Sequence, residues 1–284
     1  MNKIAEYFII NSHRGAFKNG LLENSIPAFK ESYFEGANVV ECDIRKTKDN
    51  EIVLIHNKTI NHIVSFAEKI PPEDEFNEKP IGLVKEHTFD YLKEIKFPNN
   101  AKILNLSEFL ELLKFLRIGA QIEIKETGCE EKILQIFEQA NISYDDHIGP
   151  IVCTSFNWLI IRKLIHLSKR YNIPYYSYNG KKGLAFGFQA ISLGNPFGKF
   201  IIKQFHKMNI WGGMTHYKFM PVKRLEYAHK YGIKFCPRIP DNKELAMSYL
   251  KAGVDGFETD NISFIRECVI EAGRESELPP IPEK

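Results

Sequence analysis

The sequence has no long apolar run, no leader-like segment and no regular cysteine pattern. No stretch of about 18 apolar residues occurs, so we expect no membrane-spanning helix and no stable insertion into a membrane. No basic region and small-residue cleavage site precede the first strand-like run. The five cysteines are irregularly spaced, which argues against a zinc site or a disulfide framework and is typical of buried, reduced thiols. Together these absences predict a cytoplasmic protein.

The chain also lacks a large excess of charge of one sign. The 38 Lys and Arg against 36 Asp and Glu give a formal net charge of +2, and the basic residues are scattered along the sequence. A charge so close to neutral does not favour nucleic acid or an anionic membrane as a partner. We therefore expect a small-molecule ligand, and the sequence leaves the oligomeric state open. A length of 284 residues and a hydrophobic content of 44% are typical of a globular protein of one large domain or two smaller ones.

Strand-like apolar runs alternate with amphipathic helical patterns along most of the chain. Eight such repeats in about 250 residues predict an α/β fold, a (β/α)8 TIM barrel, formed by a single domain over residues 1–284. A doubly wound open sheet is the competing arrangement. The predicted strands are 7–11, 38–43, 120–124, 150–154, 173–177, 209–213, 233–237 and 256–259. The predicted helices are 25–35, 107–115, 130–140, 156–171, 221–231, 242–252 and 263–273.

Two features interrupt the repeat after the second barrel strand. Residues 46–51 form a polar turn and 52–56 a further strand, so we expect a hairpin that returns His56 toward the end of that barrel strand. Residues 57–99 are long and partly polar, and we interpret them as a small insertion above the barrel mouth without a core of its own. The most apolar tract, 183–200, is predicted to be a loop, either a lid or a loop packed on a helix.

Two carboxylates lie inside the second predicted strand. Because side chains alternate along a strand, Glu41 and Asp43 point the same way. Left uncompensated they would cost several kcal/mol and repel each other, so a cation must neutralise them. Glu123 lies at the end of the next barrel strand, and all three can converge at the C-terminal ends of the strands. Such all-oxygen ligation suits one hard divalent cation, Mg²⁺ or Ca²⁺.

Basic and titratable side chains are expected at the same end of the barrel. Arg14 and Lys125 suit a phosphate, the first as a bidentate fork and the second as a point charge. His13 and His56 titrate near neutral pH and suit a general acid and a general base. Together with a metal, these groups predict phosphoryl transfer to a hydroxyl or to water. The alternative is that Arg14 and Lys125 only form buried salt bridges with the carboxylates, without any metal.

In order and spacing these fragments resemble the glycerophosphodiester phosphodiesterase family. The resemblance rests on His13-Arg14-Gly15, Glu23-Asn24-Ser25, the strand with Glu41 and Asp43, residues 52–56 and Glu123-Ile124-Lys125, with weaker matches at 154–156, 228–232 and 253–260. It implies a TIM barrel with Mg²⁺ or Ca²⁺ at the three carboxylates, His13 and His56 as the acid–base pair, and Arg14 and Lys125 on the phosphate. The implied reaction is hydrolysis of a glycerophosphodiester to glycerol 3-phosphate and an alcohol.

The chain departs from the family pattern at three places. Asn57 follows His56 where the family has Asp, Leu22 replaces a Pro, and Pro237 and Arg238 stand where the family has the Trp of its glycerol wall. The last change puts the alcohol moiety in doubt, and Arg238 either contacts a second anionic group of the substrate or lies on the surface. Two other functions stay open. One is a lysophospholipase D or sphingomyelinase-D-like enzyme with residues 185–200 as the acyl trough, and the other is a non-catalytic phosphate-binding barrel.

Overall fold

The computed structural model describes residues 7–68, 82–176, 182–189, 193–194 and 196–283. The strands are β1 Ile9–Ser12, β2 Val39–Lys46, β3 Ile52–Leu54, β4 Gly119–Ile124, β5 Ile151–Thr154, β6 Ala185–Phe188, β7 Gly212–Gly213, β8 Lys234–Phe235 and β9 Gly256–Thr259. The α-helices are α1 Ile26–Phe34, α2 Asn61–Val64, α3 Phe89–Lys93, α4 Leu106–Leu116, α5 Glu130–Ala140, α6 Trp158–Ser168, α7 Gly198–Lys207, α8 Leu225–His229, α9 Lys243–Lys251 and α10 Ile262–Glu271.

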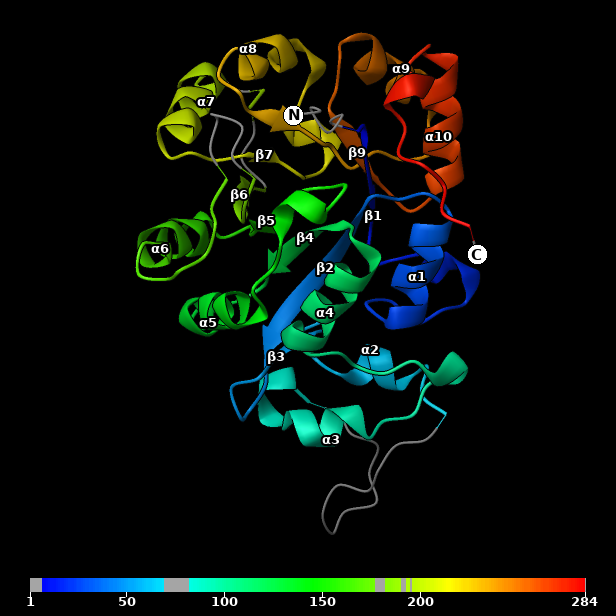
Figure 1. Cartoon of the computed structure of the whole chain (residues 1–284), viewed down its shortest axis with the longest axis vertical. Helices are drawn as coiled ribbons and strands as arrows, with labels where there is room; N and C mark the ends of the chain where they lie inside the picture. The colour runs from blue at the N-terminus through cyan, green and yellow to red at the C-terminus, as the bar shows by residue number, and fades with distance from the viewer. Residues whose placement is uncertain (1–6, 69–81, 177–181, 190–192, 195, 284) are drawn as a thin grey trace.

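Eight parallel strands form a nearly closed barrel, with helices around the outside (Figure 1). The strands follow the order β8-β7-β6-β5-β4-β2-β1-β9, and β3 pairs with β2 outside this path. An isolated parallel bridge between Arg238 and Glu258 joins the two ends of the sheet. The predicted (β/α)8 barrel is confirmed, and its closure brings the last strands of the chain beside the first.

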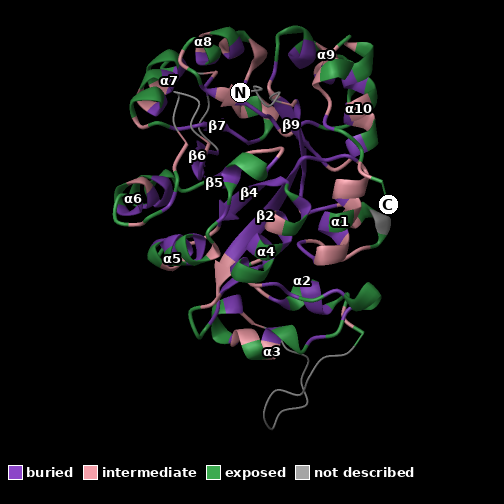
Figure 2. Ribbon diagram, viewed as in Figure 1, coloured by how far each residue is buried: buried purple, intermediate pink, exposed green. Residues whose placement is uncertain are grey.

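Side-chain caps mark where several of the outer helices begin. Ser25 accepts the backbone N–H of Ala28 in front of α1, and Pro27 stands in the first turn. Asn105 and Glu108 form a reciprocal capping box at the start of α4. The apolar faces of these helices cover the outside of the barrel, while their outer faces are exposed (Figure 2).

The inside of the barrel changes from apolar to polar along its axis. Near the starts of the strands it is filled by a cluster of buried apolar side chains, among them Ile9, Val39, Val152, Ala185 and Trp211. Further along four of the strands come buried polar side chains, namely Asn11 of β1, Glu41 of β2, Gln121 of β4 and Glu258 of β9. The interior is therefore apolar at the N-terminal ends of the strands and polar at the C-terminal ends, where barrels carry their functional groups.

The prediction for the fifth barrel strand is wrong. Residues 173–176 are not a strand, and Tyr175 makes only an isolated bridge to Leu184; Ser177, the end of the predicted strand, lies outside the described residues. The barrel strand is instead β6, inside the tract that we predicted to be a loop. Gly187 weakens the strand pattern of β6, but an added Cβ there would come 3.0 Å from Val152 and Thr154. The helix α7, which begins within this tract, was not predicted either.

The predicted hairpin after β2 is present. Strands β2 and β3 pair antiparallel, with Ile44 opposite Leu54. The outer face of β3 packs on a second apolar cluster formed with the described residues of the insertion, which include α2 and α3. These elements extend the molecule beyond α4 (Figure 1). Residues 69–81 of the insertion, with its acidic run, lie outside the described residues.

Candidate active site

The turn after β1 places Arg14 against two carboxylates of the site. Arg14 and Gly15 both have positive φ, +55° and +78°, which reverses the chain directly after the strand. The reversed backbone N–H of Arg14 donates to Glu41 at 3.0 Å. The guanidinium lies 3.0 Å from Glu23 and 3.2 Å from Asp43. The predicted residue Arg14 therefore contacts the carboxylates of the candidate cation site directly.

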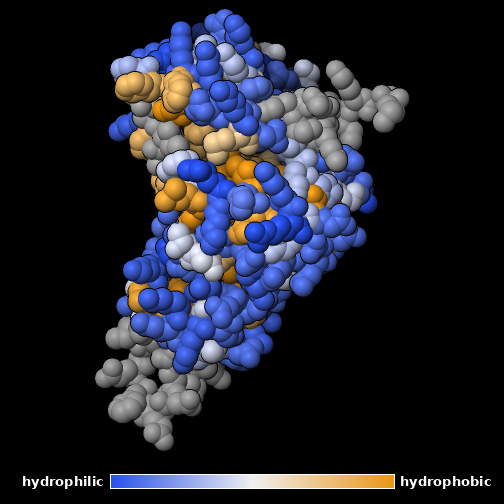
Figure 3. All heavy atoms as spheres, turned by 90° about the vertical axis from the view of Figure 1, so that its left-hand side faces the viewer, coloured by the Kyte–Doolittle hydropathy of each residue, from blue (hydrophilic) through white to orange (hydrophobic). Residues whose placement is uncertain are grey.

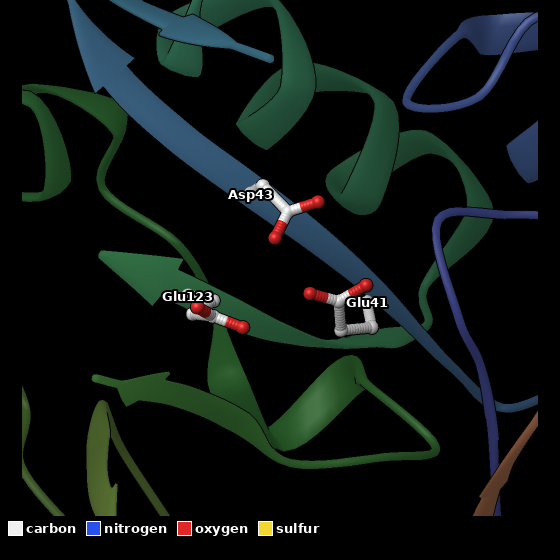
Figure 4. A group of neighbouring side chains, drawn as sticks. All are labelled: Glu41, Asp43 and Glu123. Carbon is white, nitrogen blue, oxygen red and sulfur yellow. The ribbon is translucent and has the colours of Figure 1, made fainter. Parts of the chain in front are cut away.

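The three predicted metal ligands lie together at the C-terminal ends of β2 and β4. Asp43 is the register partner of Glu123, and Glu41 lies two residues before it on the same strand face. One oxygen from each carboxylate lies within 4.8 Å of the others, and all three side chains are buried (Figure 4). Lys125 lies 2.8 Å from Asp43 and is also paired with Glu123.

The electrostatics of this cluster leave negative charge only partly compensated. Burial and the neighbouring carboxylates hold the pKa of Glu41 well above its usual range. Burial also raises the pKa of Glu123, against the opposing effect of Lys125. For Asp43, burial is outweighed by Lys125 and Arg14, so its pKa is lowered. A buried all-carboxylate set in which the pKa values of Glu41 and Glu123 are raised fits a hard divalent cation, which would stabilise the ionised forms.

His56 lies near the cluster at the end of the hairpin. Its Nδ1 is 2.7 Å from the side-chain oxygen of Asn57, so the neutral ring carries its proton on Nδ1 and keeps Nε2 as the basic nitrogen. Arg45 fixes the loop by donating to the backbone carbonyl of His56 at 2.8 Å. Burial lowers the pKa of His56, and the cations Arg14 and Lys125 lower it further. The imidazole is therefore mainly neutral at neutral pH.

His13 is held at both ring nitrogens. Its Nδ1 lies 2.8 Å from Asp260 and its Nε2 3.0 Å from the guanidinium of Arg238. Burial is the largest cause of its lowered pKa, and Arg238 and Arg14 lower it further. Of the two residues that stand in place of the family wall, Pro237 is buried and Arg238 is the one whose side chain contacts His13. Arg238 is therefore not a simple surface residue.

Two acidic residues of β9 and the segment after it were not among the predicted site residues. Asp260 accepts from His13 and lies 3.2 Å from Arg238. Glu258 is buried and faces Arg238 at 3.7 Å, and burial raises its pKa to about 7. Strand alternation places residues 256, 258 and 260 on one face, a signal that could have identified both residues.

Two amides complete the surroundings of the carboxylates. Gln189, at the end of β6, donates to Glu123 at 3.2 Å. Asn24, from the segment before α1, donates to Asp43 at 3.4 Å and accepts from its backbone N–H at 3.3 Å. Since β6 was not predicted as a strand, the role of Gln189 could not be seen in the sequence.

Comparison with known proteins assigns the family of this barrel. A sequence profile of the Glycerophosphoryl diester phosphodiesterase family matches residues 13–263. The chain belongs to this family. The glycerophosphodiester phosphodiesterase of Caldanaerobacter subterraneus subsp. tengcongensis is 27% identical over 280 residues, which cover 93% of this chain and 99% of the relative. YhdW of Bacillus subtilis, a putative glycerophosphodiester phosphodiesterase, is 23% identical over 269 residues, 90% of this chain and 96% of the relative.

Solved structures of the family confirm the fold. A phosphodiesterase of Oleispira antarctica, solved in complex with the product sn-glycerol-3-phosphate, superimposes with a TM-score of 0.70 at 17% identity, over 93% of this chain and 97% of that one. A putative glycerophosphodiester phosphodiesterase of Galdieria sulphuraria gives a TM-score of 0.69 at 17% identity, over 95% and 100%.

Family membership confirms the predicted class of enzyme. The chain is a phosphoric diester hydrolase, and glycerophosphodiester phosphodiesterase activity is the activity that its family and relatives support. Among the described residues, no helix is long and apolar enough to cross a bilayer.

Proposed function

We propose that the chain hydrolyses glycerophosphodiesters to glycerol 3-phosphate and an alcohol, in a reaction that needs one divalent cation and two histidines. The observation that carries the proposal is the placement of His13 and His56 beside the cluster of Glu41, Asp43 and Glu123, with cationic side chains between them. Metal ligands, phosphate-binding cations and titratable imidazoles are the groups that phosphoryl transfer needs.

Glu41, Asp43 and Glu123 would hold the cation, Mg²⁺ or Ca²⁺. When bound, such a cation polarises a phosphoryl oxygen and neutralises developing charge. Arg14 and Lys125 stand beside these carboxylates, where they can also contact the remaining phosphate oxygens. Because both cations are anchored by ion pairs, they are oriented before the substrate arrives.

The two histidines would exchange protons with the substrate oxygens. Both pKa values are lowered, so both rings are mainly neutral at neutral pH and either can accept the proton of the attacking hydroxyl. A lowered pKa also makes the protonated imidazole a stronger acid toward the leaving alcohol. Asp260 stabilises the protonated form of His13, whereas the neutral amide of Asn57 supports His56 without adding charge.

The alternative as a lysophospholipase D loses part of its predicted acyl trough. Residues 185–188 of the proposed trough are the buried strand β6, part of the barrel wall. Residues 190–192 and 195 lie outside the described residues. The described residues therefore favour a water-soluble glycerophosphodiester as substrate.

The test compares the release of glycerol 3-phosphate from glycerophosphocholine by the intact protein and by single histidine variants. His13→Ala and His56→Ala are expected to lose at least about 100-fold in turnover, because each removes a proton-transfer group. His166→Ala, at an exposed histidine of α6, is the matched control and should keep full activity.

Calorimetric titration with Mg²⁺ and Ca²⁺ should show metal binding retained in both active-site variants, and chelation should abolish wild-type turnover. Loss of metal binding in either histidine variant would contradict the acid–base assignment. Faster turnover of lysophosphatidylcholine than of glycerophosphocholine would instead support the lysophospholipase alternative.

A further inference from the structure

The near-neutral net charge of the chain conceals a strong separation of charge along the sequence. Residues 147–225 contain no Asp or Glu but 12 of the 38 Lys and Arg. The rest of the chain therefore carries 26 basic and all 36 acidic residues. The basic residues are spread along the chain, but the acidic residues are absent from this segment. It contains β5, α6, β6, α7 and β7, which are neighbours in the barrel.

Two helices of this basic segment begin at the mouth of the barrel. In a (β/α)8 barrel each helix follows the C-terminal end of a strand, so the first turns of α6 and α7 lie on the rim around the candidate active site. Strands β5 and β6 pair with each other, so these two rim sectors are adjacent. The active-site residue Lys125 lies 5.8 Å from the ring centre of Phe156, just before α6, which ties this rim to the site.

Large apolar side chains are exposed on this rim, where a buried position would be expected for them. Phe197 is 71% exposed and Phe200 61%, both at the start of α7. Phe156, Trp158 and Leu159 are also exposed, around the start of α6. Apolar side chains come to the surface at the levels of α6 and α7 on the face shown in Figure 3. Clustered exposed aromatic residues beside a functional site indicate an interaction surface.

Basic side chains surround these apolar groups. Lys199 and Lys203 lie four residues apart on one side of α7 and are exposed. Arg162 lies over the ring of Trp158 at 4.9 Å, and Lys218 is exposed after β7. This combination of exposed Phe and Trp with Lys and Arg, and without acidic residues, is typical of segments that lie in the interface of an anionic membrane.

We propose that the rim formed by the starts of α6 and α7 docks the barrel mouth on an anionic phospholipid surface. Phe197, Phe200 and Trp158 would enter the headgroup region, and the surrounding Lys and Arg would contact the lipid phosphates. The contact is peripheral and reversible and needs no membrane-spanning segment. It does not depend on the proposed hydrolysis, since it rests on the outer rim and not on the groups inside the barrel.

Lipid fits this surface better than nucleic acid or a second copy of the chain. A nucleic acid would use the basic residues and the aromatic rings, but it would not explain the exposure of aliphatic Leu159, which is 56% exposed beside them. A symmetric dimer through this face would bring two basic segments together, and their like charges would repel.

The test is cosedimentation of the intact protein with vesicles of phosphatidylglycerol and phosphatidylcholine, against vesicles of phosphatidylcholine alone. Binding is expected only to the anionic vesicles and should weaken with added salt. Phe197→Ser/Phe200→Ser should weaken binding roughly tenfold or more through lost apolar burial. Lys199→Glu/Lys203→Glu should weaken it to a similar extent, by roughly tenfold or more.

Matched controls come from the opposite end of the barrel. Phe115, 76% exposed in the last turn of α4, gives the control Phe115→Ser, and Lys169 and Lys207 give the control Lys169→Glu/Lys207→Glu. Both controls should bind vesicles nearly as the wild type does. All variants should keep wild-type hydrolysis of soluble glycerophosphocholine, so loss of docking and loss of the proposed activity are separable.

Three results would overturn the proposal. The first is equal binding to anionic and neutral vesicles, or none. The second is an equal loss of binding in the control variants. The third is a protein that does not bind vesicles but instead binds an oligonucleotide, or forms a dimer that Phe197→Ser/Phe200→Ser disrupts.

Discussion

At the scale of single residues, His13 is the most closely controlled group of the site. Asp260 on Nδ1 favours the protonated ring, and Arg238 on Nε2 favours the neutral one. The guanidinium occupies the nitrogen that would exchange a proton with the substrate. In the proposed mechanism Arg238 would have to release this nitrogen before His13 could act, which would make Arg238 a positioning residue for this histidine.

The opposing effects of these two partners are directly testable. Arg238→Gln removes a cation that lowers the pKa of His13, so this pKa should rise. Asp260→Asn removes the carboxylate that favours protonation, so the pKa should fall. NMR titration of the His13 ring in both variants measures the two shifts. Shifts of this pKa in the same direction in both variants, or no shifts, would show that these side chains do not control the ring. In the control Arg238→Lys, which keeps the positive charge, the pKa of His13 should remain close to the wild-type value.

The departure at Asn57 gives a second test at this scale. In Asn57→Asp a carboxylate would face Nδ1 of His56 and favour the imidazolium, so the pKa of His56 should rise. The limb of the pH–rate profile that belongs to His56 should then move to higher pH. An unchanged profile with unchanged turnover would indicate that His56 does not titrate in the reaction.

The sequence identified those site residues that lie in continuous motifs. Glu41 and Asp43 are two residues apart on one strand, and strand alternation alone predicts that they share a face. The partners of His13 were missed, because Arg238 and Asp260 are separated from it by 225 and 247 residues. The pairing of β1 with β9 brings Asp260 beside His13, and the bridge between Arg238 and Glu258 adds Arg238; local patterns contain no such information.

At the scale of elements, the turn after β1 depends on a glycine at Gly15. Its φ of +78° disfavours a side chain, and an added Cβ would lie 2.8 Å from backbone and side-chain atoms of Ala28 in α1. This close contact fixes the start of α1 against the turn. The same turn directs the backbone N–H of Arg14 to Glu41, so its geometry matters for the site as well as for stability.

Gly15→Ala should reduce the free energy of unfolding by about 2–4 kcal/mol, from backbone strain and overpacking together. Gly20→Ala is a matched control, because Gly20 has the same φ of +78° but nothing within 4 Å of an added Cβ. The control should lose only about 1 kcal/mol, the strain alone. Urea unfolding of both variants measures the difference, and equal losses would exclude the contact with Ala28 as its cause.

The elements that the sequence predicted well have strong periodic patterns, and β6 shows why the rest failed. Residues 185–188 contain Gly187, which the close approach of β5 requires but which is typical of a loop. The apolar residues 173–176 match a strand locally, yet Pro174 stands among them and the barrel uses the following segment instead. The choice between two neighbouring apolar segments is made by tertiary packing, which short-range patterns do not record.

At the scale of the whole molecule, barrel closure gathers more negative charge than the cations around it compensate. Glu258 from β9 faces the same interior as Glu41, Asp43 and Glu123 from β2 and β4, and the carboxylates raise one another's pKa values. Folding thus brings together groups that repel in their ionised forms. A bound cation would relieve this repulsion between carboxylates of β2, β4 and β9, which lie on the same side of the barrel around β1.

This repulsion predicts a pH-dependent stability with a definite sign. Burial raises the pKa of Glu258 from 4.5 to about 7, so between these values the folded state binds more protons than the unfolded one. The contribution of Glu258 to the free energy of unfolding should therefore fall as the pH rises through this window. Glu258→Gln removes the ionisable group and should be more stable than wild type at pH 8, by roughly 1–3 kcal/mol, with little difference at pH 5. Glu244→Gln on the exposed first turn of α9 is the control and should change neither value.

Ca²⁺ or Mg²⁺ at pH 8 should raise the wild-type melting temperature and narrow its difference from Glu258→Gln, because a bound cation compensates the same charge. Thermal unfolding in metal-free and metal-containing buffer measures both effects, and a stability difference between Glu258→Gln and wild type that does not grow from pH 5 to pH 8 without metal would refute this account.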